Sequence, residues 1–186
     1  MNELPSTLPR LESPRLVLRA ATLDDVDAIA RLAGRKEIAD TTATIPHPYT
    51  KEHARHFVEN QGALLTSGKA MVFVVERKAD RQLVGNTGIK DLDPVNNQAE
   101  MGFWIGVEHW RQGYATEAAG TLLNYAFDGL GLNRVAAHFM VRNPASGRVL
   151  EKIGMRREGL LRERIKKWGV FEDVVTMAIL RSDRAH

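Results

Sequence analysis

The chain has 186 residues, of which 44% are hydrophobic, so it can form one domain with a substantial core. Its formal net charge of +3 does not by itself indicate a nucleic-acid-binding protein. The absence of cysteine excludes disulfides, thiolate metal sites and a cysteine-acyl intermediate, and the six histidines show no metal-ligand spacing. Because no apolar run could cross a membrane and the N-terminus lacks the apolar segment of a secretory signal, we expect a cytoplasmic protein.

Predicted structure begins after a short N-terminal segment. Residues 1–12 are rich in proline and polar side chains, so we expect them to be loosely ordered and predict a single domain over residues 13–182. Residues 15–20 alternate apolar and polar side chains, as a half-buried strand does. Two helices follow, with Thr22 and Thr50 as their N-caps, and a loop with two prolines separates them.

The hydrophobic period then changes to two, which predicts a run of strands, and two further helices follow later in the chain. In chain order the expected elements are strand 15–20, helices 22–35 and 50–68, strands 70–77, 83–93 and 99–107, helix 116–130, strand 134–141, helix 143–154, and two strands joined near residues 167–169. This order predicts an α/β domain, with a mixed, mostly antiparallel sheet of about seven strands flanked by about four helices.

The segment HWRQGYATEA, residues 109–118, combines features that suit phosphate binding. Gly113 and Ala115 place small side chains where a predicted strand gives way to a helix. A helix N-terminus offers free backbone N–H groups and partial positive charge, which an anion can reach only past small side chains. Arg111 adds a cation, but the segment matches neither a P-loop nor the dinucleotide fingerprint. It therefore indicates a site for pyrophosphate, although an ordinary helix start can carry the same glycine.

A second motif, NPASGRVLEKIGM, predicts a short helix. Asn143 is a favoured N-cap and Gly154 a favoured C-terminal residue. Ser146 lies four residues before Leu150, so its hydroxyl shares the inward face of the helix. Such a serine can satisfy a backbone N–H group of the first turn or can point toward a bound ligand, and both interpretations remain open.

The stretch EMGFWIGVEHWRQGYATEA, followed by NPASGRVLEKIGM, resembles the GNAT N-acetyltransferase superfamily, and more narrowly its ribosomal-protein N-terminal acetyltransferase branch. The resemblance spans residues 13–180 and includes the order of elements. The family loop reads Gln/Arg-x-x-Gly-x-Gly/Ala, and Trp110 departs from it at the first position, where this branch often has an aromatic residue. The resemblance implies acetyl-CoA as the cofactor and direct acetyl transfer to an amine without a metal. It is also compatible with a homodimer.

The resemblance also implies site residues. The loop backbone would hold the cofactor pyrophosphate, the strand edge would pair with the pantetheine arm, and Ser146 would donate a proton to the departing thiolate. The expected cofactor-binding residues are Phe103, Trp104, Ile105, Val107, Arg111, Gln112, Gly113, Tyr114, Ala115, Thr116 and Asn143.

Transfer of an acetyl group to an amine needs a base, and Glu100 is the candidate. It shares a strand face with Trp104 by period-two alternation, and apolar surroundings are expected to raise its pKa, which suits a base. The resemblance implies that an acid here activates the amine, whereas a glutamate in water or paired with arginine would have no such role. Asp91, Asp93 and Glu117 are less well placed.

The sequence does not distinguish between the possible acceptor amines. His47 and Tyr49 could line its pocket, and Trp168 could shape that pocket or a dimer contact. The acceptor is a protein N-terminal amine, favoured by a wide acidic groove, or a small amine such as an antibiotic, polyamine or amino acid, favoured by a closed pocket. A third hypothesis is an acyl-CoA-binding sensor without turnover. Dispersed basic residues give no reason to expect nucleic acid.

Overall fold

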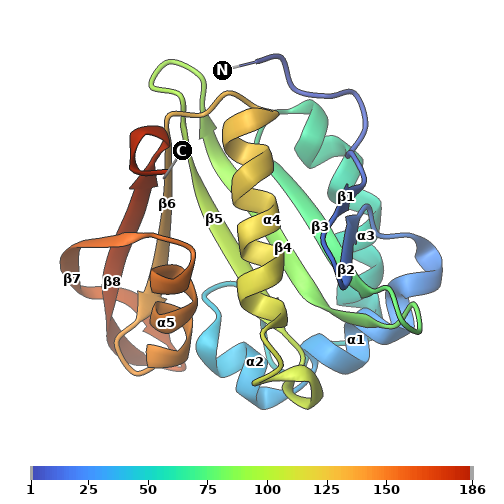
Figure 1. Ribbon diagram of the computed structural model, residues 1–186. Helices are drawn as coiled ribbons and strands as arrows, with labels where there is room; N and C mark the ends of the chain where they lie inside the picture. Colours follow the sequence, from blue (N-terminus) through green and yellow to red (C-terminus); the bar gives the residue numbers. More distant parts are fainter. Residues whose placement is uncertain (1, 185–186) are drawn as a thin grey trace.

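The computed structural model describes residues 2–184, which form one eight-stranded sheet covered by helices on both faces (Figure 1). The strands are β1 (Leu11–Glu12), β2 (Leu16–Arg19), β3 (Ala70–Arg77), β4 (Leu83–Asp93), β5 (Gln98–Ile105), β6 (Arg134–Met140), β7 (Arg156–Lys167) and β8 (Val170–Leu180). The α-helices are α1 (Val26–Ala33), α2 (Lys36–Thr41), α3 (Lys51–Thr66), α4 (Tyr114–Asp128) and α5 (Pro144–Lys152). Single 3₁₀ turns are η1 (Leu23–Asp25), η2 (Val107–His109) and η3 (Arg181–Asp183).

The centre of the sheet contains an opening between two strands. The strand order is β1-β2-β3-β4-β5-β6-β8-β7, and within the described part of the chain β5 and β6 are the one parallel pair. Their pairing runs only from Gln98 opposite Arg134 to Met101 opposite Ala137. Beyond these residues β5 continues to Ile105 and β6 to Met140 without pairing to each other. The two strands therefore separate at their carboxyl ends, where a ligand can lie against free backbone groups.

Alternation along the strands divides the core between two helical layers. Phe73 and Val75 pack in the cluster that contains α4, whereas Val74 packs with α1 and α3 on the opposite face. Helix α4 crosses the front of the sheet in Figure 1 and buries Phe127 completely. Because α4 is held against the sheet along its length, its N-terminus is fixed beside the opening between β5 and β6.

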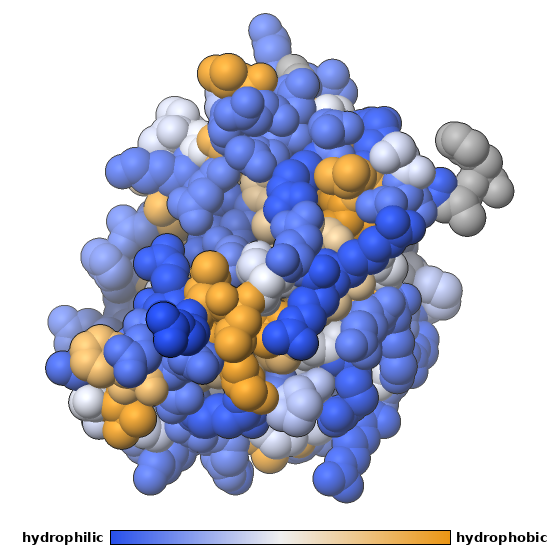
Figure 2. Space-filling view, turned by 90° about the vertical axis from the view of Figure 1, so that its left-hand side faces the viewer, coloured by the Kyte–Doolittle hydropathy of each residue, from blue (hydrophilic) through white to orange (hydrophobic). Residues whose placement is uncertain are grey.

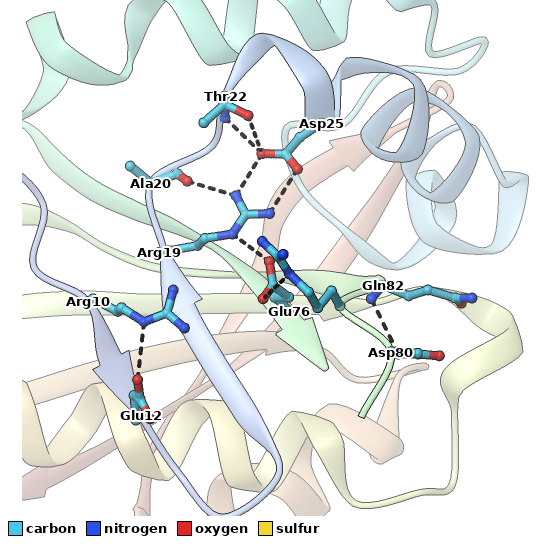
Figure 3. A network of polar contacts seen from close by, with 10 residues as sticks. Arg10, Glu12, Arg19, Ala20, Thr22, Asp25, Glu76, Asp80 and Gln82 are labelled. Carbon is cyan, nitrogen blue, oxygen red and sulfur yellow. Dashed lines mark hydrogen bonds and ion pairs between the residues drawn. The ribbon is translucent and has the colours of Figure 1, made fainter. Parts of the chain in front are cut away.

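A buried ion-pair network joins the first strands to the turn before α1 (Figure 3). The Arg19 guanidinium donates to Asp25 Oδ2 at 2.7 Å and to Glu76 Oε2 at 2.7 Å. Burial alone would raise the pKa of Asp25, but hydrogen bonds from Arg19 and Thr22 lower it below its usual value. Both carboxylates are more than nine-tenths buried, so loss of Arg19 would leave Asp25 without a cation and Glu76 with only Arg81, whose Nε lies 4.0 Å from Oε1.

The fold class and the order of the predicted elements are confirmed, with two additions. The sheet has eight strands rather than about seven, because β1 pairs with β2 through Leu11 opposite Leu18. Residues expected to be loosely ordered thus contribute a strand, and the Asn2 N–H donates to the Leu130 carbonyl at 2.7 Å. Helix α2 was not predicted, because six residues are too few to show a helical period.

The side of the molecule bearing β7 and β8 carries exposed apolar side chains among hydrophilic ones (Figure 2). Leu160, Val170 and Phe171 are 43%, 62% and 55% exposed. Between residues 2 and 184, no helix combines the length and the hydropathy that a membrane span requires.

Candidate functional site

Two adjoining cavities occupy the opening between β5 and β6. The larger, of about 610 Å³, lies among the end of β5, the loop before α4 and the first turn of α5. The smaller, of about 390 Å³, lies on the side of α1, α3 and the loop after α2. Both are lined by Thr41, Thr42, Phe103, Trp104 and Ser146. A ligand in one cavity can therefore meet a ligand in the other at this shared wall.

The N-terminus of α4 faces the larger cavity with its backbone exposed. Gly113 is the N-cap, its φ is +81°, and no side chain caps the helix. Arg111 also adopts a positive φ of 62°. Left-handed residues of this kind turn successive N–H groups to one side, and the first-turn N–H groups of a helix lack intrahelical partners. Tyr114, Ala115 and Thr116 line the cavity at this end, so the loop can hold an anion as the sequence predicts.

Arg15 fixes this loop in place, a role that sequence analysis missed. Its Nη1 donates to the Gln112 carbonyl at 3.0 Å, and its guanidinium lies 4.8 Å from the ring centroid of Tyr114. Its Nε also donates to Glu117 Oε2 at 2.6 Å, and the Ser13 hydroxyl donates to the same carboxylate at 2.7 Å. Glu117 thus anchors Ser13 and Arg15, and it lines neither cavity. No local pattern signals Arg15, because it is 97 residues away from Gln112.

Cations surround the larger cavity, and none of the described carboxylates lines it. Arg142 is neutralised, since it pairs with Asp40 at 2.8 Å and with Glu172 at 2.7 Å. The other arginine and lysine side chains that line this cavity make no ion pair with any residue between 2 and 184. They are Arg111, Arg148 and Lys152. Unpaired cations beside a free helix N-terminus suit a ligand with several negative charges.

Asn143 and Ser146 form a pair at the start of α5. The Asn143 Oδ1 accepts from the Ser146 backbone N–H, as the N-cap prediction requires. Its Nδ2 donates to Ser146 Oγ at 3.1 Å, which leaves the serine hydroxyl proton free to be donated elsewhere. Ser146 lines both cavities, so this free donor lies at their shared wall.

Glu100 lines the smaller cavity, but its environment differs from the predicted one. Burial raises its pKa, yet hydrogen bonds from His138 and Lys90 outweigh burial and lower the pKa to about 2. Lys90 Nζ lies 2.9 Å from Oε1, and His138 Nδ1 lies 3.2 Å from Oε2. The expectation of a raised pKa is therefore wrong, because β4 and β6 place cationic or hydrogen-bonding partners on both sides of β5.

Other predicted residues divide into those at the cavities and those away from them. The larger cavity is lined, as expected, by Phe103, Trp104 and Ile105. Two other expected residues do not line it, namely Val107, which lies in η2, and Gln112. Tyr49 lines the smaller cavity, and His47, which precedes a cis proline, does not.

Trp168 lies in the exposed turn between β7 and β8, outside both cavities, with Lys36 Nζ 5.5 Å from its ring centroid. The neighbouring Lys167 does act on the smaller cavity. Its buried Nζ donates to the carbonyls of Thr42 and Ile45 at 2.8 and 3.1 Å and so holds the loop that lines that cavity.

Known proteins resemble this chain along most of its length. A family model described as an acetyltransferase (GNAT) domain matches residues 15–156. The chain is 31% identical over 173 residues to the uncharacterised N-acetyltransferase YoaA of Bacillus subtilis, and the match covers 93% of this chain and 97% of the relative. The structure of Mycobacterium smegmatis RimJ in complex with CoA-disulfide has a TM-score of 0.89 at 22% identity, covering 99% of this chain and 93% of that one.

Two further relatives are named for different acceptors. The spermidine N(1)-acetyltransferase of Vibrio cholerae is 33% identical over 110 residues, 59% of this chain and 63% of that protein. The ribosomal-protein-serine acetyltransferase of Escherichia coli is 27% identical over 114 residues, 61% of this chain and 63% of that protein. The resemblance inferred from the two motifs is thus confirmed. The chain belongs to the GNAT acetyltransferase family and is an N-acetyltransferase.

Proposed function

We propose that the protein transfers the acetyl group of acetyl-CoA to the α-amine of a protein or peptide N-terminus. The donor lies in the larger cavity and the acceptor in the smaller one, so that acetyl group and amine meet at the wall that Phe103 and Ser146 line in both. The amine attacks the thioester carbonyl directly within this ternary complex.

The larger cavity fits the donor in its charge and in the backbone groups that line it. Acetyl-CoA carries its negative charge on phosphates, and the uncapped N-terminus of α4 with Arg111, Arg148 and Lys152 offers complementary groups. Beyond Met101, the edge of β5 that faces away from β4 does not pair with β6, and it offers backbone groups to the amides of the pantetheine arm. Gly113 keeps this approach open, because it carries no side chain at the N-cap.

The smaller cavity is not the acidic groove that we expected for a basic protein N-terminus, but its charge argues against a polyamine acceptor. Glu100 is the one carboxylate among its lining residues in the described part of the chain, and Lys90 already pairs with it. A polyamine with several ammonium groups would meet one compensated carboxylate, which gives it little electrostatic stabilisation. An N-terminal α-amine has a pKa of about 8, against about 10.4 for a side-chain ammonium, so a larger fraction is neutral and able to attack at neutral pH.

Acetylation of a panel of amines tests this proposal. Peptides beginning with serine or alanine, the same peptides with blocked α-amines, free amino acids and spermidine are incubated with enzyme and acetyl-CoA. Mass spectrometry then locates the acetyl group. Transfer to the free α-amine of peptides and none to blocked peptides supports the proposal. Faster transfer to spermidine or to free amino acids assigns the protein to small amines instead.

Ligand-induced stabilisation tests the donor independently of the acceptor. A ligand at about one hundred times its Kd stabilises the folded state by roughly 2.7 kcal/mol, which raises the melting temperature measurably. Acetyl-CoA and coenzyme A should each raise it, and ATP should not. An equal shift with ATP would mean that the loop before α4 binds phosphates without selecting coenzyme A.

A further inference from the structure

A histidine that no motif singled out faces the acceptor side. His138 lies on β6 one residue beyond Ala137, the last residue that pairs with β5, and it lines the smaller cavity. The separation of the strands thus leaves room beside its ring. Its side chain is 29% exposed, and its Nδ1 lies 3.2 Å from Glu100 Oε2.

The contact with Glu100 determines which ring nitrogen carries the proton. An ionised carboxylate only accepts hydrogen bonds, so a neutral imidazole beside it carries its proton on Nδ1 and donates that proton to Glu100. The lone pair then lies on Nε2. Within residues 2–184, His138 Nε2 has no hydrogen-bond partner. The ring thus presents a free proton acceptor to the smaller cavity.

Glu100 itself is poorly suited to accept a proton. Lys90 occupies one of its oxygens at 2.9 Å and His138 the other at 3.2 Å. These partners lower the pKa of the carboxyl to about 2, so it stays ionised in the presence of an ammonium group. A permanent negative charge at this place can hold the imidazole in one orientation and stabilise the imidazolium once it forms.

We propose that His138 is the general base of acetyl transfer and that Glu100 is its positioning residue. This inference rests on the proposed function. The amine nitrogen forms a bond to the thioester carbonyl carbon, and its proton passes to His138 Nε2. The C–S bond breaks, its electron pair stays on sulfur, and the Ser146 hydroxyl hydrogen-bonds this thiolate until it takes a proton from solvent. His138 later releases its proton to water.

The variant His138→Asn tests the base without removing its contact. An asparagine amide can replace Nδ1–H as the donor to Glu100, but it has no group that accepts a proton at neutral pH. We expect kcat with an acceptor peptide to fall by about 10²- to 10⁴-fold, the range of general-base catalysis, while affinity for coenzyme A stays unchanged. The matched control is His56→Asn, because His56 lies exposed on α3 and lines neither cavity.

A pH profile separates a base from a structural contact. The wild-type kcat/KM should fall toward acid pH with the protonation of the base, and His138→Asn should lose this inflection. The titratable groups that line the smaller cavity with His138 are Glu100 from β5, Lys90 from β4 and Tyr49 from the loop before α3, whereas its neighbour on β8 is the uncharged Thr176. Added imidazole should restore activity to His138→Ala. A rate within threefold of wild type for His138→Asn would overturn the proposal.

Nitrogen NMR of the histidine rings gives a test that needs no acceptor. In the wild-type protein the His138 ring should carry its proton on Nδ1, and Glu100→Gln should weaken this preference, because a side-chain amide can also donate. A proton found on Nε2 in the neutral ring would refute the assignment even if the enzyme is active. If no peptide is acetylated, the proposed function fails while the NMR result still decides which nitrogen is free.

Discussion

Replacement of Glu100 by glutamine should lower stability in a pH-dependent way. The folded-state pKa of Glu100 is about 2 and the ordinary value is 4.5. This difference corresponds to about 3 kcal/mol of stabilisation at neutral pH, and screening lowers it because the side chain is 25% exposed. A carboxyl with a lowered folded-state pKa stabilises the fold above pH 4.5. That contribution is lost as the pH falls from 4.5 toward 2.

Urea unfolding of wild type and Glu100→Gln across this pH range measures the effect. The wild-type advantage should decrease by about 1 kcal/mol between pH 5.5 and pH 3.5, because one unit of pH is worth about 1.4 kcal/mol per proton. The control is Glu59→Gln on α3, an exposed carboxylate without an ion pair within residues 2–184. A difference between wild type and Glu100→Gln that is the same at every pH would refute the reasoning, since the carboxyl would then titrate alike in both states.

Three further substitutions test the larger cavity and its support. Gly113→Val should weaken binding of coenzyme A at least about tenfold in calorimetry, because the N-cap has a φ of +81°, which costs an L-residue about 1–2 kcal/mol. The control Gly62→Ala, which has open space around its Cβ, should bind coenzyme A normally. Gly147→Ala should destabilise the fold by about 1–3 kcal/mol in urea unfolding, because its Cβ would lie 2.7 Å from the Phe139 ring; an unchanged midpoint would show that the ring moves freely. Arg148→Gln should weaken coenzyme A binding by about 0.2–1 kcal/mol, and the loss should shrink at high salt; a salt-independent loss would point to lost packing instead.

Local patterns in the sequence predicted most of the elements, although not β1 or α2. Alternation predicted β4 with its observed bounds, and the Asn-Pro pair predicted the start of α5, because these signals depend on neighbours within a few residues. The small side chains of Gly113 and Ala115 likewise predicted a helix start with an accessible backbone, and Gly113 is the N-cap of α4. The family could likewise be identified from the residues of the two motifs, because each motif is a continuous stretch of the chain.

Only the tertiary structure decided which groups act on one another across the sheet. The register of β4, β5 and β6 brings Lys90 and His138 to Glu100, and this reverses the expected direction of its pKa shift. Arg15 reaches the loop before α4 across 97 residues, and β5 separates from β6 after four paired residues to open the cavities. Pairing of distant strands depends on how all of them pack together, so no local sequence pattern specifies it. The sequence by itself therefore determined the family, most elements of the fold and the helix start at Gly113, and the packed sheet determined which charged groups meet at Glu100.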